Sequence, residues 1–538
     1  MRDEEYAALK KSQISASDVL QSSAPDSFLV LHPSSLLIWL DRVIIGWLFV
    51  MVAAAPHSIA ATQIAWMCGM LVWVVRLVVR RRWHTTPVDY ALGCFMLLTV
   101  VSAFTSYAPD ISIGKLRAAS LFTIVYLVAE NVDSRRVLRL LAFTLIASCM
   151  VNVIFTMVQR VVGRGITIEG VSTTSPLASA IFLGANGQVA HGIQSGDTLL
   201  EVDGRKLTSL DELAAALDDV HNGSRPAEIR VYRSEWTGIY KMERGQLLSG
   251  SASKERLGVE AWSHGRDWRA SGFFGHYVTY AEALLLIASF AFGLLIALNN
   301  KWSLTGALLL ICVVGFGMAL LLTVTRASQL GFLISAVLIV LAGLTSRRAV
   351  LGLTACVIPL VLVSLFVLQQ KRHISFFDSN DASISWRTTV WREGFALLVS
   401  RPRHLVVGVG MDSTKRYGCQ WGLFDNCRLP IGHMHSTPLQ LALERGIPAL
   451  IAWFFILGIY GRMLWRLARS EAVGAWTERG IALGALGGLA GFFASGVVHY
   501  NFGDSEVVMI FYLIMGLTLS LERQTRLDRF RPVGATDA

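Results

Sequence analysis

Apolar stretches close to 20 residues long recur along most of the chain. A helix rises about 1.5 Å per residue, so a stretch of about 20 residues crosses the ~30 Å hydrocarbon core of a bilayer. Hydrophobic residues make up 53% of the chain and charged residues only 16%, whereas a soluble domain averages about 25% charged residues. The sequence therefore predicts an all-α polytopic membrane protein embedded in a lipid bilayer, and it excludes a soluble one.

Hydropathy predicts about twelve membrane-spanning helices. They lie near residues 37–55, 59–78, 88–107, 113–130, 137–159, 274–297, 303–324, 329–345, 350–369, 448–467, 480–498 and 505–521.

Cationic clusters fall in alternate connections between these spans. They are Arg80, Arg81 and Arg82; Arg135, Arg136 and Arg139; Lys301; Arg347 and Arg348; Arg462, Arg466 and Arg469; and Arg523, Arg526 and Arg529. The positive-inside rule then puts these connections and both termini in the cytoplasm. The two long connections, about 160–272 and 370–447, are expected on the outer face. The net charge of +10 thus reads as a topology signal, and no nucleic-acid partner is expected.

The expected domain organisation follows from this topology. It comprises a cytoplasmic tail at 1–35, five spans in 36–160, an extracytoplasmic domain at 165–260, four spans in 270–370, a second extracytoplasmic loop at 371–447, three spans in 448–522 and a cytoplasmic tail at 523–538.

Cysteine placement fits this topology. Five of the seven cysteines lie inside predicted spans, and only Cys419 and Cys427 lie in a polar loop. A thiol within a span behaves as a small hydrophobe. In an oxidising compartment the loop pair would form a disulfide, and two free thiols are the alternative.

The first long loop changes character at residues 171–233, where turn residues and short β-branched runs predict a small α+β domain. Gly196 and Asp197 form a turn into a strand at 198–202, and Ser209 with Glu212 forms a capping box before a helix. A closing strand is expected at 229–232. The run GQVAHGIQSGDTLLEVDGRKLTSLDELAAAL at 187–217 resembles the PDZ domains of bacterial envelope proteases.

That resemblance implies a domain that binds extended peptides at a sheet edge. Residues 179–184, where the peptide-binding loop should lie, contain no obvious carboxylate-capture sequence. We therefore favour a spacer or protein-docking role over capture of C-termini, which stays as the alternative.

Three strings carry a second resemblance: TVTRASQLGFL at 323–333, SISWRTTVWREGFALLVSRPRHLVVGVGMD at 383–412, and HMHSTPLQLALERGIPAL at 433–450. They resemble the O-antigen ligase and polymerase superfamily, whose members transfer sugar chains from undecaprenyl diphosphate outside the inner membrane. The order shared with that superfamily is Arg326, Arg387, the pair Gly408 and Gly410, and His435 ahead of a Glu-x-Gly sequence.

A further string, RASGFFGHYVTYAEALLL at 269–286, is similar to the family's Arg and Gly-Phe sequence leading into a helix. The resemblance thus covers most of 269–520, while the PDZ-like insert lies outside it. Two details differ, because Ser436 stands where the family often has Asn, and Ala327 replaces a common Gly.

The chemistry of these residues suits a lipid diphosphate. Arginine forms bidentate, charge-assisted bonds to phosphate oxygens and stays protonated when partly desolvated. Arg326 interrupts an apolar hairpin, where a central arginine costs about 2.5–3.5 kcal/mol on insertion scales. We expect Arg326 and Arg387 to bind the diphosphate. The alternative for Arg326 is snorkelling to lipid headgroups, and for Arg387 it is the polar face of an interfacial helix, where Trp386 and Trp391 would rest in the interface.

His435 is the expected catalytic residue, because a neutral imidazole accepts a proton from an attacking sugar hydroxyl near neutral pH. A helix-capping histidine is its alternative. Arg269, His433 and Tyr277 are further candidates for substrate binding. Attack on the anomeric carbon from the face opposite the diphosphate predicts inversion. Neither a metal nor a cofactor is expected, because no Asp-x-Asp, His-Glu-x-x-His or Cys-x-x-Cys motif is present.

Other functions remain open on the sequence. A polymerase of the same superfamily would differ from a ligase only in its acceptor, another lipid-linked glycan instead of the lipid A core. A transporter of lipid-linked glycans would also need intramembrane arginines but would not need His435. An intramembrane protease is disfavoured, since its nearest feature, Ser495 with His499, is more typical of helix packing and capping.

Overall fold

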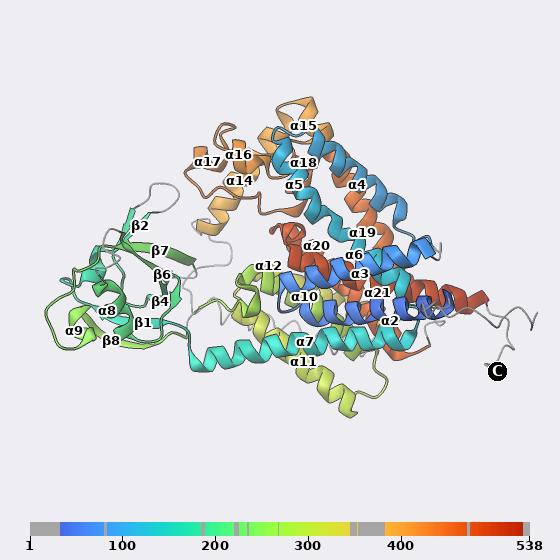
Figure 1. Cartoon of the computed structure of the whole chain (residues 1–538), viewed down its shortest axis with the longest axis horizontal. Coiled ribbons are helices and arrows are strands. Elements are labelled where there is room, and N and C mark those ends of the chain that lie inside the picture. The colour runs from blue at the N-terminus through green and yellow to red at the C-terminus, as the bar shows by residue number, and fades with distance from the viewer. Residues whose placement is uncertain are drawn as a thin grey trace, which may run out of the picture.

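The computed structural model of the chain describes residues 33–79, 83–183, 189–219, 225–233, 236–266, 268–344, 352, 382–470 and 474–530. Within these ranges the protein is helical except for one β-sheet domain, which lies to one side of the helices in Figure 1. The long helices are α2 (Pro33–Ala54), α3 (Ile59–Val79), α4 (Asp89–Phe104), α7 (Arg135–Val162), α10 (Tyr277–Ala297), α11 (Leu304–Leu322), α12 (Arg326–Gly343), α14 (Ala382–Val399), α19 (Ile447–Ala468), α20 (Trp476–Gly496) and α21 (Ser505–Phe530).

Within the described ranges, 9 helices are long and apolar enough to cross a membrane, so the protein is polytopic. The expected count of twelve is not confirmed. The span expected at 350–369 lies outside the described residues. The one expected at 88–107 is α4, which has only 16 residues. The one expected at 480–498 is α20, which has 21 residues. It is rich in glycine and has Glu478 and Arg479 in its first turn, which lowers its mean hydropathy.

The span expected at 113–130 is interrupted. It consists of α5 (Pro109–Ala119), a short 3-10 turn (Ser120–Phe122) and α6 (Thr123–Asn131).

Helix α10 is the centre of the bundle, and 94% of its most apolar window is buried. It packs against α20 and α12, and glycines make this close approach possible. A side chain at Gly293 would collide with the backbone of Gly484, and one at Gly491 with that of Gly331. Small residues at helix crossings let backbones approach closely in membrane proteins, where dispersion and not water exclusion drives association.

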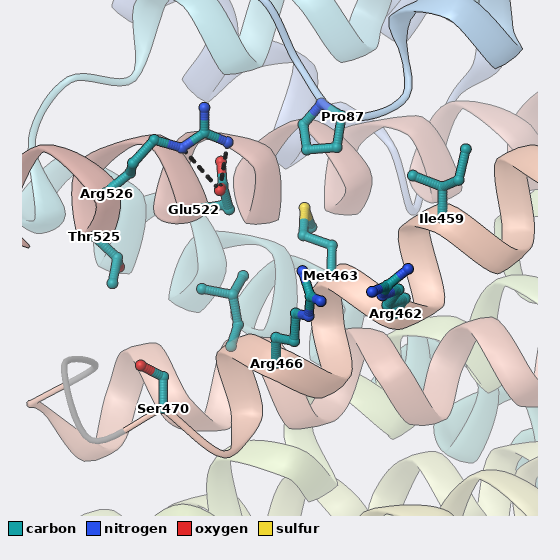
Figure 2. Close-up of a pocket in the computed structure, with 10 residues that line it drawn as sticks. Pro87, Ile459, Arg462, Met463, Arg466, Ser470, Glu522, Thr525 and Arg526 are labelled. Atoms are coloured by element: carbon teal, nitrogen blue, oxygen red, sulfur yellow. Dashed lines mark hydrogen bonds and ion pairs between the residues drawn. The ribbon is translucent and has the colours of Figure 1, made fainter.

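Helices α19 and α21 each have one end near the second long loop. Their other ends enclose a cavity of about 440 Å³ that Arg462, Arg466 and Arg526 help to line (Figure 2).

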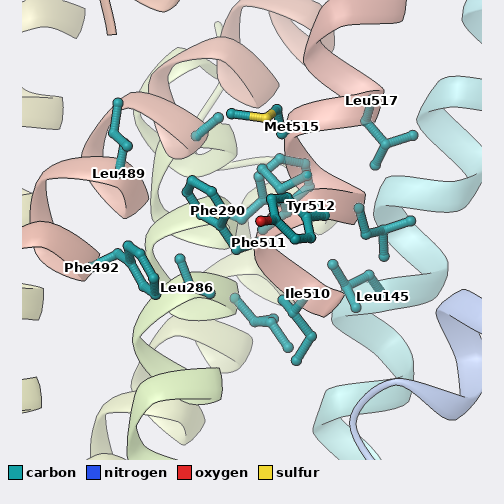
Figure 3. Close-up of a cluster of buried hydrophobic side chains, with 14 of the residues drawn as sticks. Leu145, Leu286, Phe290, Leu489, Phe492, Ile510, Phe511, Tyr512, Met515 and Leu517 are labelled. Carbon is teal, nitrogen blue, oxygen red and sulfur yellow. The ribbon is translucent and has the colours of Figure 1, made fainter. Parts of the chain in front are cut away.

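The core between α7, α10, α20 and α21 is aromatic and aliphatic (Figure 3). Phe492 of α20 stacks on Phe511 of α21 with ring centroids 4.7 Å apart, and Phe290 of α10 is fully buried beside them. This packing fixes the relative positions of the helices whose ends carry the candidate site.

The β-sheet domain contains eight strands in the order β3-β2-β7-β6-β4-β1-β8, with β5 paired to β4. The strands are β1 (Ile166–Val171), β2 (Ile181–Leu183), β3 (Val189–His191), β4 (Thr198–Val202), β5 (Arg205–Lys206), β6 (Ala227–Arg233), β7 (Trp236–Met242) and β8 (Val259–His264). Helix α8 (Leu210–Asp218) and the short α9 (Ser253–Arg256) complete the domain. Its buried residues form a hydrophobic cluster of their own.

The β-sheet domain contains the strand and the helix cap that the sequence predicts. The strand expected at 198–202 coincides with β4, and Ser209 caps α8 by accepting from the Glu212 amide at 3.3 Å. Glu212 bonds to the Thr208 amide at 2.7 Å, one residue earlier than a capping box requires. The expected closing strand at 229–232 lies within β6 but does not close the sheet, because β7 and β8 follow it.

The described part of the second long loop folds onto the bundle at the upper side of Figure 1. It contains α14 followed by α15 (Pro402–Val407), α16 (Ser413–Tyr417), α17 (Leu423–Cys427) and α18 (Thr437–Arg445). A small core that includes Val390, Val409, Phe424 and Met434 holds these helices together. Cys419 and Cys427 form a disulfide within this loop, with their Cα atoms 5.3 Å apart.

Candidate active site

His435 lies in the segment between α17 and α18, in a backbone conformation that is rare for a residue with a side chain. Its φ is 47°. The residue before it is held from two sides, because the Met434 amide donates to Gln440 Oε1 at 2.6 Å and its carbonyl accepts from Trp391 Nε1 at 2.8 Å. A strained residue persists only where its surroundings hold it, and such residues cluster at functional sites.

Aromatic rings surround the His435 imidazole. Trp386 of α14 lies edge-on to it with ring centroids 4.2 Å apart, and His433 lies 4.0 Å away. Trp386 and Trp391 therefore both contact the His435 segment. The sequence gave no information about the loop that contacts these two side chains.

The chain directly after His435 is fixed by the turn between α20 and α21. The Thr437 amide donates to the His499 carbonyl at 3.0 Å, and the Thr437 hydroxyl donates to Asn501 Oδ1 at 2.9 Å. The start of α18, and with it the position of His435, thus depends on residues 499–501.

That turn is itself fixed by a buried carboxylate. Glu282 of α10 is fully buried, and its Oε1 lies 2.9 Å from His499 Nδ1 and accepts from the Ser328 hydroxyl at 3.0 Å. Ser495 also donates to Glu282, and Asn501 Nδ2 donates to its other oxygen at 3.3 Å. Glu282 therefore joins the ends of α10, α12 and α20 beside the His435 segment. Sequence analysis missed this role, although a glutamate within an apolar span is a recognisable signal.

The arginines expected to bind substrate lie on different helices around this point. Arg387 is on α14, one residue after Trp386, and its charge contributes to lowering the pKa of His435. Arg326 is the first residue of α12, two residues before Ser328, which bonds to Glu282. Both arginines are partly buried. The structure thus brings α14 and α12 to the same end of the bundle.

Arg269 and Tyr277, two of the further candidates for substrate binding, form a stack with His276. The Arg269 guanidinium lies over the Tyr277 ring at 4.4 Å, and His276 stacks on that ring at 4.8 Å. The charge of His276 contributes to lowering the pKa of His435.

A second buried carboxylate supports the other side of the site. Glu444 of α18 accepts from the Asp412 amide at 2.9 Å and from Gln440 Nε2 at 2.8 Å. Burial raises its pKa. Asp412 in turn pairs with Lys115 at 2.7 Å and with Lys415 at 3.1 Å. Sequence analysis did not single out these lysines, because Lys115 comes from α5, far away in the chain.

The pKa values of His433 and His435 are both lowered, so these two imidazoles are neutral at neutral pH. Burial, with the charge of Lys415 as the next cause, lowers the pKa of His433 to about 4. Burial lowers the pKa of His435 further, and the charges of His433 and Arg387 act in the same direction. Both imidazoles are therefore unprotonated at neutral pH, and His435 lies close enough to Arg387, whose guanidinium suits phosphate oxygens, to be affected by its charge. No group of three or more metal-ligating side chains occurs among the residues that the structure describes.

The fold and this site define a multi-pass membrane protein with a cluster of histidine, arginine and buried carboxylate side chains at one end of its helix bundle. Residues 310–454 match the family model described as O-antigen ligase. This match supports the ligase and polymerase superfamily and indicates a role in glycan transfer during surface polysaccharide synthesis. It includes Arg326, Arg387, His433 and His435, whereas Glu282 and His499 lie outside it. None of the curated proteins compared with the chain matches it.

Proposed function

We propose that this protein transfers a glycan from an undecaprenyl-diphosphate donor to a sugar hydroxyl of an acceptor, as an O-antigen ligase does. The observation that carries the proposal is the neutral, strained His435 held beside Arg387, within a segment that matches the O-antigen ligase family. No metal or other cofactor has a part in the reaction proposed.

In the proposed reaction, His435 accepts the proton of the attacking hydroxyl as its oxygen bonds to the anomeric carbon. The bond from that carbon to the diphosphate oxygen breaks on the opposite face, so the configuration inverts. Arg326 and Arg387 neutralise the departing diphosphate. Arg269, Tyr277 and His433 contact the donor or acceptor sugar.

The low pKa of His435 in the free protein fits a role that begins only when the donor is bound. A base with a low pKa is a weak one, and efficiency is highest when the pKa lies near the working pH. A bound diphosphate brings negative charge next to the imidazole, and negative charge raises the pKa of a nearby histidine. We therefore expect donor binding to activate His435. Before the donor binds, the low pKa of His435 keeps it from accepting a proton.

We propose that the site faces the periplasm, with both termini in the cytoplasm of a bacterium and the protein in its inner membrane. Two observations support this orientation. The cationic clusters fall in connections of the sequence that alternate with those carrying Arg387 and His435, and the Cys419–Cys427 disulfide belongs to an oxidising compartment.

For the domain at 165–260 we propose a spacer or protein-docking role, retaining the PDZ-like resemblance. Its hydrophobic cluster is independent of the bundle, and β8 is an edge strand that pairs with β1, which suits strand addition by a partner. Titration of the isolated domain with free-carboxylate peptides tests this, and micromolar binding would favour C-terminus capture instead.

Replacement of His435 by Ala tests the central proposal and separates a transferase from a transporter. We expect the variant to lose glycan transfer in vesicles while it still binds the lipid-linked donor, since the arginines remain. The matched control is His404→Ala, because His404 is a buried histidine of the same loop that bonds to Tyr107. Transfer retained by His435→Ala would overturn the mechanism.

The surface glycans of a deletion strain identify the acceptor. Loss of attachment to the lipid A core indicates a ligase, which we favour. Loss of chain length with attachment intact indicates a polymerase.

A further inference from the structure

The cavity between α19 and α21 lies at the end of the bundle away from His435. Both helices begin near the site: α19 follows α18 directly, and α21 follows the turn that bonds to Thr437. They have 22 and 26 residues, which corresponds to roughly 33 and 39 Å of helix. The cavity, of about 440 Å³, lies between their far ends (Figure 2).

The cavity combines an apolar wall with basic side chains. Met463 and Leu467 of α19 contribute apolar surface, and Arg462 and Arg466 come from the same face of that helix, one turn apart. Arg526 and Glu522 come from α21. This arrangement places guanidinium groups next to a hydrophobic surface, as an amphiphilic ligand requires.

The positive charge of the cavity is only partly neutralised. Arg526 pairs with Glu522 at 2.6 Å, as the dashed lines in Figure 2 indicate. Neither Arg462 nor Arg466 forms an ion pair within the part of the chain that the structure describes. Two cations are thus available to an anion, and adjacent guanidinium groups favour phosphate because each can donate two parallel hydrogen bonds.

The position of the cavity identifies the source of that phosphate. Ile447–Ala468 and Ser505–Asp528 are both candidate membrane spans, so the ends that enclose the cavity lie at headgroup depth. Basic pockets between helix ends are suited to anionic lipid headgroups. We propose that this cavity binds the phosphate-bearing headgroup of an anionic lipid, with Arg462 and Arg466 on the phosphate and Met463 and Leu467 against the first part of its acyl chains.

General membrane topology does not account for this arrangement, since the positive-inside rule depends on the number of cations in a connection and requires no cavity. Arg469 provides the comparison. It lies on the same helix end but its guanidinium covers the Trp465 ring at 4.4 Å, and it does not line the cavity. Replacement of Arg469 therefore removes the same charge without altering the proposed site.

The test uses the full chain in detergent and measures bound lipid by native mass spectrometry and by the thermal unfolding midpoint during titration. Phosphatidylglycerol is the probe and phosphatidylcholine the zwitterionic control. Each basic residue near a surface contributes a factor of about 5 to the binding of an anionic lipid. We therefore expect Arg466→Gln to weaken phosphatidylglycerol binding about 5-fold and R462Q/R466Q about 30-fold. Arg469→Gln should leave binding unchanged.

The Lys variants R462K/R466K keep the charge and lose the bidentate geometry, so intermediate binding supports the proposal even if the Gln variants fold poorly. Equal binding of both lipids by the wild-type protein would overturn it, as would an equal loss in Arg469→Gln and Arg466→Gln. Inorganic phosphate is a third probe. If phosphate alone displaces the lipid and gives the same stabilisation, the ligand is a soluble phosphate and the lipid assignment is wrong.

Discussion

His499 Nδ1 lies 2.9 Å from Oε1 of Glu282, a carboxylate that is fully buried at the end of α10. The His499 carbonyl accepts from the Thr437 amide, two residues after His435. A buried charge in a membrane protein is costly unless it is paired and hydrogen-bonded. Two of the residues that satisfy Glu282, His499 and Asn501, also bond to Thr437 and so help to determine where His435 lies.

Glu282→Gln is expected to reduce glycan transfer by at least about tenfold while the protein still folds. The amide keeps the shape of the side chain, but it loses charge-assisted bonds worth about 1.5–3 kcal/mol each, so the 499–501 turn and the start of α18 shift. The change acts through position, and we expect donor binding to change less than the rate of transfer. Transfer assays and donor binding on one preparation check this.

Glu130→Gln is the matched control for that substitution. Glu130 is also buried and also pairs with a histidine, His84, at 2.7 Å, but it belongs to α6 and has no contact with the site. If both variants lose transfer to the same extent, Glu282 has only a general structural role.

The pH dependence of stability reports on the buried histidines. The pKa of His433 is lowered to about 4 in the folded protein, against about 6.5 in the unfolded chain. Between these values the unfolded chain binds more protons, so the free energy of unfolding decreases as the pH falls from about 6.5 toward 4. Above pH 6.5 the contribution of His433 is fully present.

Thermal unfolding midpoints at pH 7.5, 6 and 5 in detergent measure this slope. We expect His433→Asn to make it shallower, because one titrating group has been removed. His264→Asn controls for the loss of a histidine, since His264 is exposed on β8. An unchanged slope in His433→Asn would show that the ring is not held neutral.

The helices could largely be predicted from the sequence, because a membrane span is recognisable from its local composition. The span expected at 329–345 is observed as α12, which begins at Arg326. Local composition does not reveal the partners of a helix. The hydrogen-bond partner of Trp391, the Met434 carbonyl, lies in a loop 43 residues away in the chain.

The residues of the candidate site could also be predicted only in part. Residues that carry a family motif, such as His435, could be identified from the sequence. Glu282 and His499 could not be paired, because they are 217 residues apart and each has an ordinary alternative role. Ser495 and His499 suggested packing and capping, whereas in the structure both bond to Glu282.

The Cys419–Cys427 disulfide is expected to stabilise the loop that carries the site. Closing a loop of this length contributes about 2–3 kcal/mol by reducing the entropy of the unfolded chain. The loop also needs support, because Phe424 and the three residues after it have positive φ, which costs energy for residues other than glycine. The amide of Asp425 bonds to Glu393 on α14 at 3.2 Å, so loosening this loop should also affect the helix of Arg387.

We expect C419S/C427S to unfold at a lower temperature than the wild-type protein and to be insensitive to a reducing agent. The wild-type protein and Cys68→Ser, which changes a remote thiol on α3, should both be destabilised by reduction. Equal melting of the double variant and the oxidised wild-type protein would show that the disulfide does not stabilise this loop.

Arg387 provides the most direct test of donor recognition. Its guanidinium is close enough to His435 to affect the pKa of that residue, so a diphosphate bound there would contact both side chains. A charge-assisted, bidentate contact is worth about 1.5–3 kcal/mol, which predicts that Arg387→Gln lowers kcat/KM for the lipid-linked donor about 10- to 100-fold. Arg387→Lys should recover only part of this, because lysine lacks the planar fork.

Arg392→Gln is the matched control, since Arg392 is exposed on the same helix. The measurement is the rate of transfer at a series of donor concentrations for each variant. Equal losses in the two Gln variants would mean that α14 attracts the donor only through its overall charge, and that Arg387 does not contact the diphosphate.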